Sequence, residues 1–214
     1  MYRDRIEAGQ RLARLLESCR SANPVVLALP RGGVVVGFQI AGALGCPLDV
    51  IVARKLGAPQ QREFGFGAVA PGGVRVIDQE AVHMLGLTQG RIEEIVAAET
   101  AEMQRRAAAY RGEQPPLDIA ARTAILVDDG LATGVTARAA IAAIRQARPR
   151  QLILAVPVAP PDTAEAIRPL VDELVCPLTP KGFRAVGQWY EDFEQTSDFE
   201  VIELLRQNRQ QRSR

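Results

Sequence analysis

The chain has 214 residues, 47% of them hydrophobic and 24% charged, which favours a soluble single domain with its own core and at most a small appendage. The formal net charge of +1 gives no reason to expect bulk binding to nucleic acid or to a membrane surface. Three scattered cysteines, the lack of a long apolar segment and a charged N-terminus are typical of a cytoplasmic protein with reduced thiols, and they argue against a disulfide framework, a membrane span and a signal peptide.

Apolar periodicity divides the chain into helices and strands that mostly alternate. Two capping boxes are expected, Asp162 with Glu165 and Ser197 with Glu200, and the polar tail from Gln207 is expected to fray. In chain order the predicted elements are a helix over residues 6–16, a strand over 25–29, a helix over 34–44, a strand over 49–53, a loop excursion over 54–73 with a short hairpin around 66–76, a helix that Thr88 caps and that reaches about 110, a strand over 123–127, a helix to about 147, a strand over 152–158, a helix from about 162, a strand over 171–176 and a last helix through 201–205.

This alternation predicts an α/β fold with a doubly wound, mostly parallel sheet flanked by helices, in a single domain over residues 1–214. Ligands of such sheets bind beyond the carboxyl ends of the strands. The loops that follow the strands are therefore the first places to look for a functional site.

The run from Thr123 to Thr136 reads Thr-Ala-Ile-Leu-Val-Asp-Asp-Gly-Leu-Ala-Thr-Gly-Val-Thr. A buried strand that opens into a loop at a helix N-terminus can bind phosphate, because the backbone N–H groups there lack partners and the helix dipole is positive. Gly130 and Gly134 allow the backbone to curl into an anion-binding nest, and Thr133 and Thr136 add hydroxyl donors.

Two adjacent carboxylates, Asp128 and Asp129, precede this nest although acids repel phosphate. The arrangement makes sense if the ligand carries both a phosphate and sugar hydroxyls, because the carboxylates can accept hydrogen bonds from a ribose diol. The alternative is a buried strand followed by an acid-capped helix, which would need only one acid.

The run resembles the ribose-5-phosphate loop of the type I phosphoribosyltransferase family, whose members use phosphoribosyl pyrophosphate (PRPP). The family pattern is four apolar residues, two acids, a small or apolar pair, a variable residue, Thr-Gly, a variable residue and then Thr or Ser, and every position is present here. The resemblance extends from about Val25 to Val201, with the phosphate loop its most specific part. It implies that the 5-phosphate is bound by Gly130, Leu131, Ala132, Thr133, Gly134, Val135 and Thr136.

The turn Pro30-Arg31-Gly32-Gly33 follows the first predicted core strand and is the candidate pyrophosphate loop. By itself it is equally consistent with an ordinary tight turn. The resemblance implies a cis peptide bond between Pro30 and Arg31, which would direct successive N–H groups at the pyrophosphate.

The segment after the second strand carries further candidates. The resemblance implies that Arg54 and Lys55, and with them Arg62, neutralise the departing pyrophosphate, in a flexible loop over 54–73 that closes over PRPP. Glu63-Phe64-Gly65 is similar to a Glu-Tyr-Gly segment of adenine-type members, which makes Glu63 a candidate acid or base. The alternatives are a solvated basic turn and a surface glutamate.

A C-terminal hood over about 178–205, together with the N-terminal helix, is expected to cover the acceptor, outside a core over about 24–177. Lys181, Phe183 and Trp189 are its candidate acceptor residues, although the spacing of the aromatic residues departs from the purine enzymes by one residue. Ala132 replaces the aspartate of hypoxanthine and guanine enzymes. A hydrophobic cluster beneath a loop explains the aromatic residues equally well, and His83, the one histidine, is expected on the surface.

The resemblance implies transfer of ribose 5-phosphate from PRPP to a nitrogen nucleophile, of which a nucleobase, as in purine salvage, is the first choice. Mg²⁺ is the expected cofactor, held through PRPP and water near Asp128 and Asp129, with no direct ligand from the protein. The expected partners are PRPP and a small acceptor, with no nucleic acid or membrane, and a homodimer is common among similar proteins. A PRPP-sensing regulator without transferase activity and an enzyme with an acceptor other than a base stay open. A P-loop or dinucleotide fold lacks its glycine signature.

Overall fold

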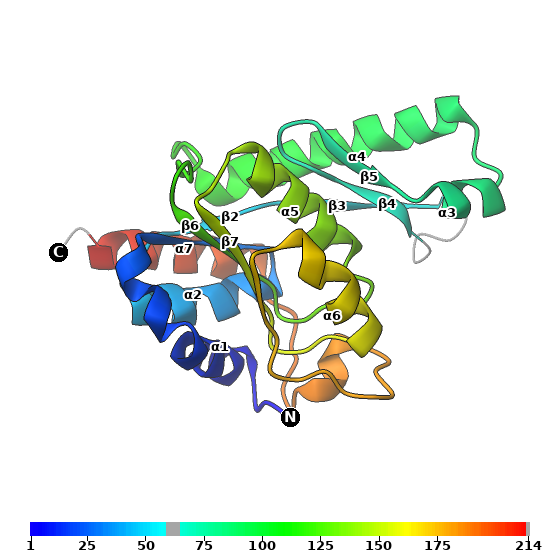
Figure 1. Ribbon diagram of the computed structural model, residues 1–214. Coiled ribbons are helices and arrows are strands. Elements are labelled where there is room, and N and C mark those ends of the chain that lie inside the picture. Colours follow the sequence, from blue (N-terminus) through cyan, green and yellow to red (C-terminus); the bar gives the residue numbers. More distant parts are fainter. Residues whose placement is uncertain (59–64, 213–214) are drawn as a thin grey trace.

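The computed structural model describes residues 1–58 and 65–212. Its central sheet is parallel throughout, with the strand order β2-β1-β6-β7-β8 (Figure 1). These strands are β1 (Pro24–Ala28), β2 (Leu48–Val50), β6 (Thr123–Val127), β7 (Gln151–Ala155) and β8 (Glu173–Val175). The predicted doubly wound fold is therefore confirmed.

A second, antiparallel sheet of three strands lies beside α4 and projects from the central sheet (Figure 1). It consists of β3 (Arg54–Gly57), β4 (Gly65–Ala70) and β5 (Val74–Ile77), and it is followed by α3 (Gln79–Met84) and α4 (Gln89–Arg111). The hairpin around 66–76 is confirmed. The prediction of a loop was wrong for residues 54–57, because these residues pair with β4 as a strand, and the short helix α3 was not foreseen.

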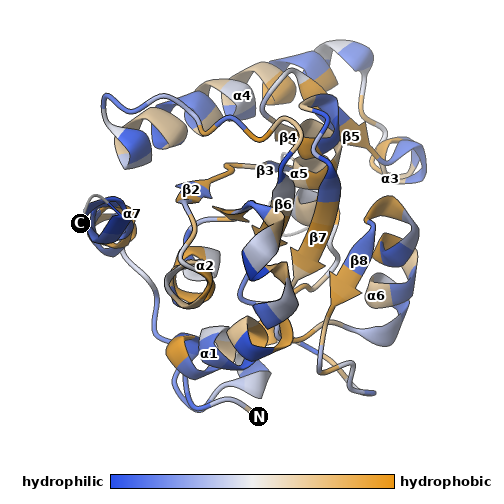
Figure 2. Ribbon diagram, turned by 60° about the vertical axis from the view of Figure 1, so that its left-hand side comes forward, coloured by the Kyte–Doolittle hydropathy of each residue, from blue (hydrophilic) through white to orange (hydrophobic). Residues whose placement is uncertain are grey.

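Helices cover both faces of the central sheet, as the edge-on view in Figure 2 shows. One side carries α1 (Arg5–Leu15), α2 (Gly32–Leu44) and α7 (Asp198–Arg212), and the other carries α5 (Val135–Gln146) and α6 (Pro161–Ile167). Short 3-10 turns are η1 (Glu17–Ala22), η2 (Arg168–Leu170) and η3 (Val186–Trp189). The strands supply both cores by alternation, since Val26 and Ala28 pack on the α2 side whereas Val25 and Leu27 pack on the α5 side.

The ends of three helices test the capping predictions. Thr88 caps α4, because its hydroxyl accepts a hydrogen bond from a first-turn N–H, and the Ser197 hydroxyl accepts from the Glu200 N–H at 3.1 Å. The capping box at Asp162 was wrong, since α6 starts after Pro160 with no side-chain cap.

The C-terminal tail continues as helix to Arg212 instead of fraying from Gln207. The reason is Asn208, a buried residue that joins α7 to the edge of the sheet. Its Oδ1 accepts from the Leu48 N–H at 2.9 Å, and its Nδ2 donates to the Cys46 carbonyl at 3.2 Å.

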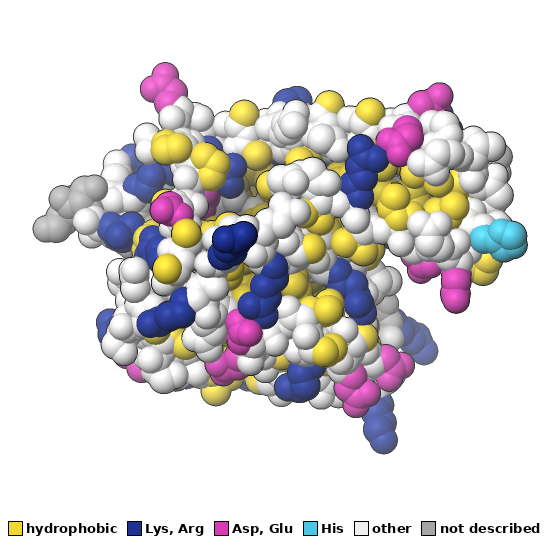
Figure 3. Space-filling view, turned by 45° about the horizontal axis from the view of Figure 1, so that its top comes forward, with side chains coloured by type: hydrophobic (Ala, Val, Ile, Leu, Met, Phe, Trp, Pro, Cys, Tyr) yellow, Lys and Arg dark blue, Asp and Glu magenta, His cyan; other side chains and the backbone are white. Residues whose placement is uncertain are grey.

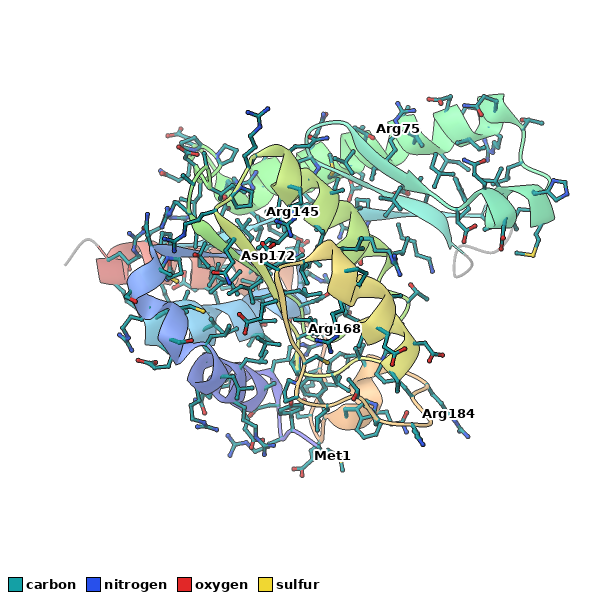
Figure 4. The ribbon with its side chains drawn as sticks, in the orientation of Figure 1. Met1, Arg75, Arg145, Arg168, Asp172 and Arg184 are labelled. Atoms are coloured by element: carbon teal, nitrogen blue, oxygen red, sulfur yellow. The ribbon has the colours of Figure 1, made fainter. Side chains whose placement is uncertain are left out.

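Ion pairs join neighbouring layers elsewhere. Arg145 of α5 and Asp172, just before β8, point toward each other in Figure 4, and their closest atoms lie 2.9 Å apart. The three cysteines are free thiols, and burial raises the pKa of Cys46 to about 11. Among the described residues, no helix combines the length and the apolar character that a membrane span needs.

The strand order places a topological switch between β1 and β6, which are direct neighbours. The chain leaves β1 toward α2 on one side of the sheet, and it leaves β6 toward α5 on the other side. The two loops thus diverge at the carboxyl ends of adjacent strands, which is where ligands of open α/β sheets bind.

Candidate functional site

The two predicted anion-binding loops meet at this switch point. A Cβ atom on Gly32 would lie 1.9 Å from Asp129 Oδ2, and one on Gly33 would lie 2.9 Å from the Val127 carbonyl oxygen. Only glycine allows such a close approach. The structure therefore brings the Pro30–Gly33 turn into direct contact with the acid pair, and the peptide bond from Pro30 to Arg31 is cis, as the resemblance implied.

The loop after β6 forms an open bend at the start of α5. In the described part of the chain, the backbone N–H groups of residues 132–136 donate to no protein atom. Gly134 is the N-cap in the left-handed conformation, with φ of 70°, and the Thr133 side chain is exposed. This bend can accept an anion on free N–H groups at the positive end of a helix dipole.

Two of the predicted phosphate-loop residues also make contacts within the fold. Leu131 is buried, and its N–H donates to the Val158 carbonyl at 2.9 Å. Gly130 lies against Val186 of the C-terminal segment, since a Cβ at this position would come within 2.5 Å of that side chain. Residues 132–136 are therefore the part of the loop whose N–H groups are left as candidates to bind an anion.

The paired carboxylates lie at the rim of the sheet, half-buried, rather than inside the core. Asp128 Oδ1 accepts the Asp129 N–H at 2.8 Å, and Asp129 Oδ2 accepts from Arg5 Nε at 2.7 Å. Burial, and after it the neighbouring charge of Asp129, raise the pKa of Asp128 well above its usual range, while Arg5 opposes the shift. Ionisation of both carboxyls at once is therefore unfavourable at this site.

Arg5 is a site residue that the sequence analysis missed. It is the first residue of α1, 124 positions before its partner Asp129. Its NH1 group donates to the Glu194 carbonyl at 2.7 Å, and its guanidinium carbon lies 3.8 Å from the centre of the Phe193 ring. No local pattern in the sequence distinguishes this arginine from the others of the first helix.

The predicted hood packs on the N-terminal residues. Tyr2 forms a bridge with Tyr190, whose hydroxyl donates to the Asp129 carbonyl at 2.6 Å. Phe183 and Trp189 stack with ring centres 6.4 Å apart, and Lys181 is exposed. Residues 198–205, which the prediction included in the hood, form the first half of α7 and pack against α2 and α4.

The predicted basic pair is divided between two faces of β3. Arg54 forms an ion pair with Glu99 of α4, with N···O distances of 2.7 and 2.8 Å, and its role at the pyrophosphate stays a prediction. Lys55 lines a pocket of about 500 Å³ together with Thr133, Val135 and Arg138, and it also borders the pocket that Arg54 and Glu99 line. Strand alternation explains this division.

Two further predicted positions lie away from the loops or outside the described part of the chain. Glu63, like Arg62, lies outside the described residues. His83 is exposed on α3, as predicted, and Figure 3 shows the one histidine as cyan atoms on the surface.

The carboxylates of Asp128 and Asp129 are the groups in this site that suit a divalent metal ion. Carboxylate oxygens suit Mg²⁺. Among the described residues, no three metal-binding side chains form a cluster, so a metal ion beside Asp128 and Asp129 would take most of its ligands from a bound anion and from water.

Comparisons with known proteins show the family of the chain. The family model described as "Phosphoribosyl transferase domain" matches residues 2–191, a range that includes both loops and the first part of the hood. Two curated relatives from strains of Mycobacterium tuberculosis, "Putative phosphoribosyl transferase MT0597" and "Putative phosphoribosyl transferase Rv0571c", are 42% identical over 96% of this chain and 46% of their own length, so the chain spans about half of these relatives. The crystal structure of TT1426 from Thermus thermophilus has a TM-score of 0.80 and 40% identity, with 95% of this chain and 97% of that chain covered.

Proposed function

The chain belongs to the phosphoribosyl transferase domain family, and we propose from this premise that it transfers ribose 5-phosphate from PRPP to a nitrogen nucleophile and releases pyrophosphate. The observation that carries the proposal is the contact between the two loops at the β1–β6 switch. One molecule with a phosphate at one end, a diol in the middle and a pyrophosphate at the other end would span both loops.

The phosphate end fits the bend at the start of α5. The N–H groups of residues 132–136, which donate to no protein atom in the described part of the chain, lie at a helix N-terminus, and Thr133 and Thr136 add hydroxyl groups. Lys55 and Arg138 contribute positive charge to the adjoining pocket. Binding energy at this remote phosphate can offset the cost of orienting the reacting carbon.

The acid pair fits the ribose. Asp128 and Asp129 would accept hydrogen bonds from the two ring hydroxyls, and their crowded negative charge favours a cation beside them. Positive charge develops on the ribosyl ring as the C1–O bond lengthens. The pair therefore stabilises the positively charged ribosyl ring of the transition state more than the uncharged ring of the bound substrate, which is the requirement for catalysis.

The pyrophosphate fits the start of α2. Arg31 is partly exposed and lies 3.8 Å from Asp198 in a loose ion pair, so its side chain can turn to an anion at little cost. Gly32 and Gly33 leave backbone room beside the acids. Mg²⁺ bound with PRPP would neutralise charge on the pyrophosphate, with Asp128 and Asp129 placed to accept its water ligands.

The acceptor would lie under the hood. The stacked rings of Phe183 and Trp189 offer a flat apolar surface, which suits a nucleobase. Glu63 keeps its proposed role as acid or base, and the chain is proposed to work in the cytoplasm.

A turnover screen tests the function. Pyrophosphate release is measured from PRPP and Mg²⁺ with a panel of purines, pyrimidines and ammonia. The double variant Asp128→Asn with Asp129→Asn is expected to lose release while its circular dichroism stays native. Asp162→Asn, an exposed acid at the start of α6, is the matched control and should keep full activity. Binding of PRPP with no release from any acceptor would instead support a PRPP-sensing regulator.

A further inference from the structure

A buried ion pair joins the N-terminal helix to the acid pair. The side chains of Arg5 and Asp129 are 12% and 16% exposed, with 2.7 Å between Nε and Oδ2. In the described part of the chain only Arg111–Asp49 is comparably buried, at 16% and 8%, and that pair fastens the end of α4 to β2. The side chains of the other ion pairs are more exposed, and exposed ion pairs contribute little to the stability of the fold.

Two segments besides Asp129 contact the Arg5 guanidinium, residues 193–194 and the turn at Gly32. The Glu194 carbonyl accepts from NH1 at 2.7 Å, the Phe193 ring lies beneath the guanidinium, and Gly32 approaches so closely that an added Cβ would lie 2.6 Å from Nε. The cation–π attraction between a guanidinium and an aromatic ring is stronger when the pair is shielded from water than when it is at the surface. The side chain therefore has one well-defined position.

This position fixes how Asp129 presents its carboxylate. Arg5 engages Oδ2, and within the described residues Oδ1 is the oxygen left to accept a hydroxyl. The hood adds a second restraint, because the Tyr190 hydroxyl donates to the Asp129 carbonyl. Two elements far apart in the chain thus orient one acid.

We propose that Arg5 is a positioning residue, which orients the Asp129 carboxylate toward a ribose hydroxyl and compensates its charge beside Asp128. The role rests on the proposed function. Arg5 would act through Asp129 and would not touch the reacting atoms.

The charges around this group determine the expected pH response. Arg5 of α1 and Tyr190 of the hood face the acid pair, and Arg5 is the one positive group of the two. The acids beside Arg5 in its surface pocket are Asp4, Asp192, Glu194 and Glu200. Removal of the Arg5 charge takes away a contribution that lowers the pKa of Asp128, so the acidic limb of the rate profile should move to higher pH.

The test compares Arg5→Gln, which keeps a donor without charge, with Arg5→Lys, which keeps charge without the flat guanidinium. Both should lower kcat by roughly 10- to 100-fold, with a smaller change in the KM for PRPP, because a misplaced acid costs rate more than affinity. Only Arg5→Gln should shift the acidic limb. Arg11→Gln, which breaks an exposed ion pair in the same helix, is the control and should change neither.

The outcomes separate two failures. If the wild-type chain releases pyrophosphate and both folded Arg5 variants match it in kcat and pH profile, the role of Arg5 is wrong and the function stands. If the wild-type chain neither binds nor turns over PRPP, the function and this role fall together. Should Arg5→Gln not fold, a normal kcat in Arg5→Lys would still overturn the role, because a lysine cannot bind the Asp129 carboxylate and the Glu194 carbonyl and also stack on the Phe193 ring as the guanidinium does.

Discussion

A methyl group at Gly32 should disable the site without unfolding the protein. In Gly32→Ala the new Cβ would start 1.9 Å from Asp129 Oδ2 and 2.6 Å from Arg5 Nε. Ordinary contact therefore requires the carboxylate to move by about 1.5 Å. Residue 32 begins α2 with no positive φ, so alanine adds no left-handed backbone strain, and the atoms nearest to its Cβ belong to Asp129 and Arg5.

A displacement of this size is large for a group that positions substrate. A shift of about 1 Å can cost roughly 100-fold in rate, equivalent to about 2.7 kcal/mol of transition-state free energy. Pyrophosphate release from PRPP, with the acceptor identified in the screen, measures the loss. Overpacking should lower the free energy of unfolding by about 1–3 kcal/mol, which a urea titration measures.

Gly42 in the same helix provides the matched control. A Cβ there meets no atom within 4 Å, so Gly42→Ala should leave turnover unchanged and stabilise the protein by about 0.5–1 kcal/mol through helix propensity. The reasoning is refuted if Gly32→Ala turns over PRPP at the wild-type rate, since the loops would then not meet as described.

Three further outcomes follow from the same structure. The raised pKa of Asp128 makes its ionised carboxylate destabilising to the folded state, so Asp128→Asn should raise the free energy of unfolding at pH 8. This gain should shrink as the pH falls toward 3.8, because the Asp128 carboxyl then becomes protonated in the folded state and, at lower pH, in the unfolded state as well. Equal urea midpoints of the two proteins at pH 8 would contradict this prediction. Lys55→Ala should weaken PRPP binding roughly 10-fold, about 1.4 kcal/mol, whereas Arg54→Ala should leave it unchanged, and calorimetry that ranks them the other way would refute the face assignment. Asn208→Ala leaves the Leu48 N–H unpaired and should cost about 1–3 kcal/mol in a urea titration, while a loss near zero would mean that water replaces the amide.

Local patterns in the sequence were sufficient for the elements whose signal is continuous. The apolar run from Thr123 to Val127 forms a fully buried strand, and the Thr-Gly turn after it begins α5 as expected. Thr88 caps α4 because its hydroxyl can reach a first-turn N–H without any tertiary partner. Such features depend on residues within a few positions of one another.

Features that depend on distant partners were missed. Nothing near Arg5 shows that it meets Asp129, because the contact exists only after α1 and the hood pack together. Arg54 and Lys55 were read as one basic pair, and their separation required knowing that β3 is a strand. The C-terminal helix continues because Asn208 contacts Leu48 of β2, which is 160 residues earlier in the chain.

The central claim is that one pocket at the β1–β6 switch binds PRPP. Titration calorimetry with PRPP, with and without Mg²⁺, tests it most directly, with the double variant Asp128→Asn and Asp129→Asn as comparison. We expect one binding site per chain, heat that requires Mg²⁺, and weaker binding in the double variant. Absence of heat at millimolar PRPP and Mg²⁺, or equal binding by the double variant, would contradict the claim.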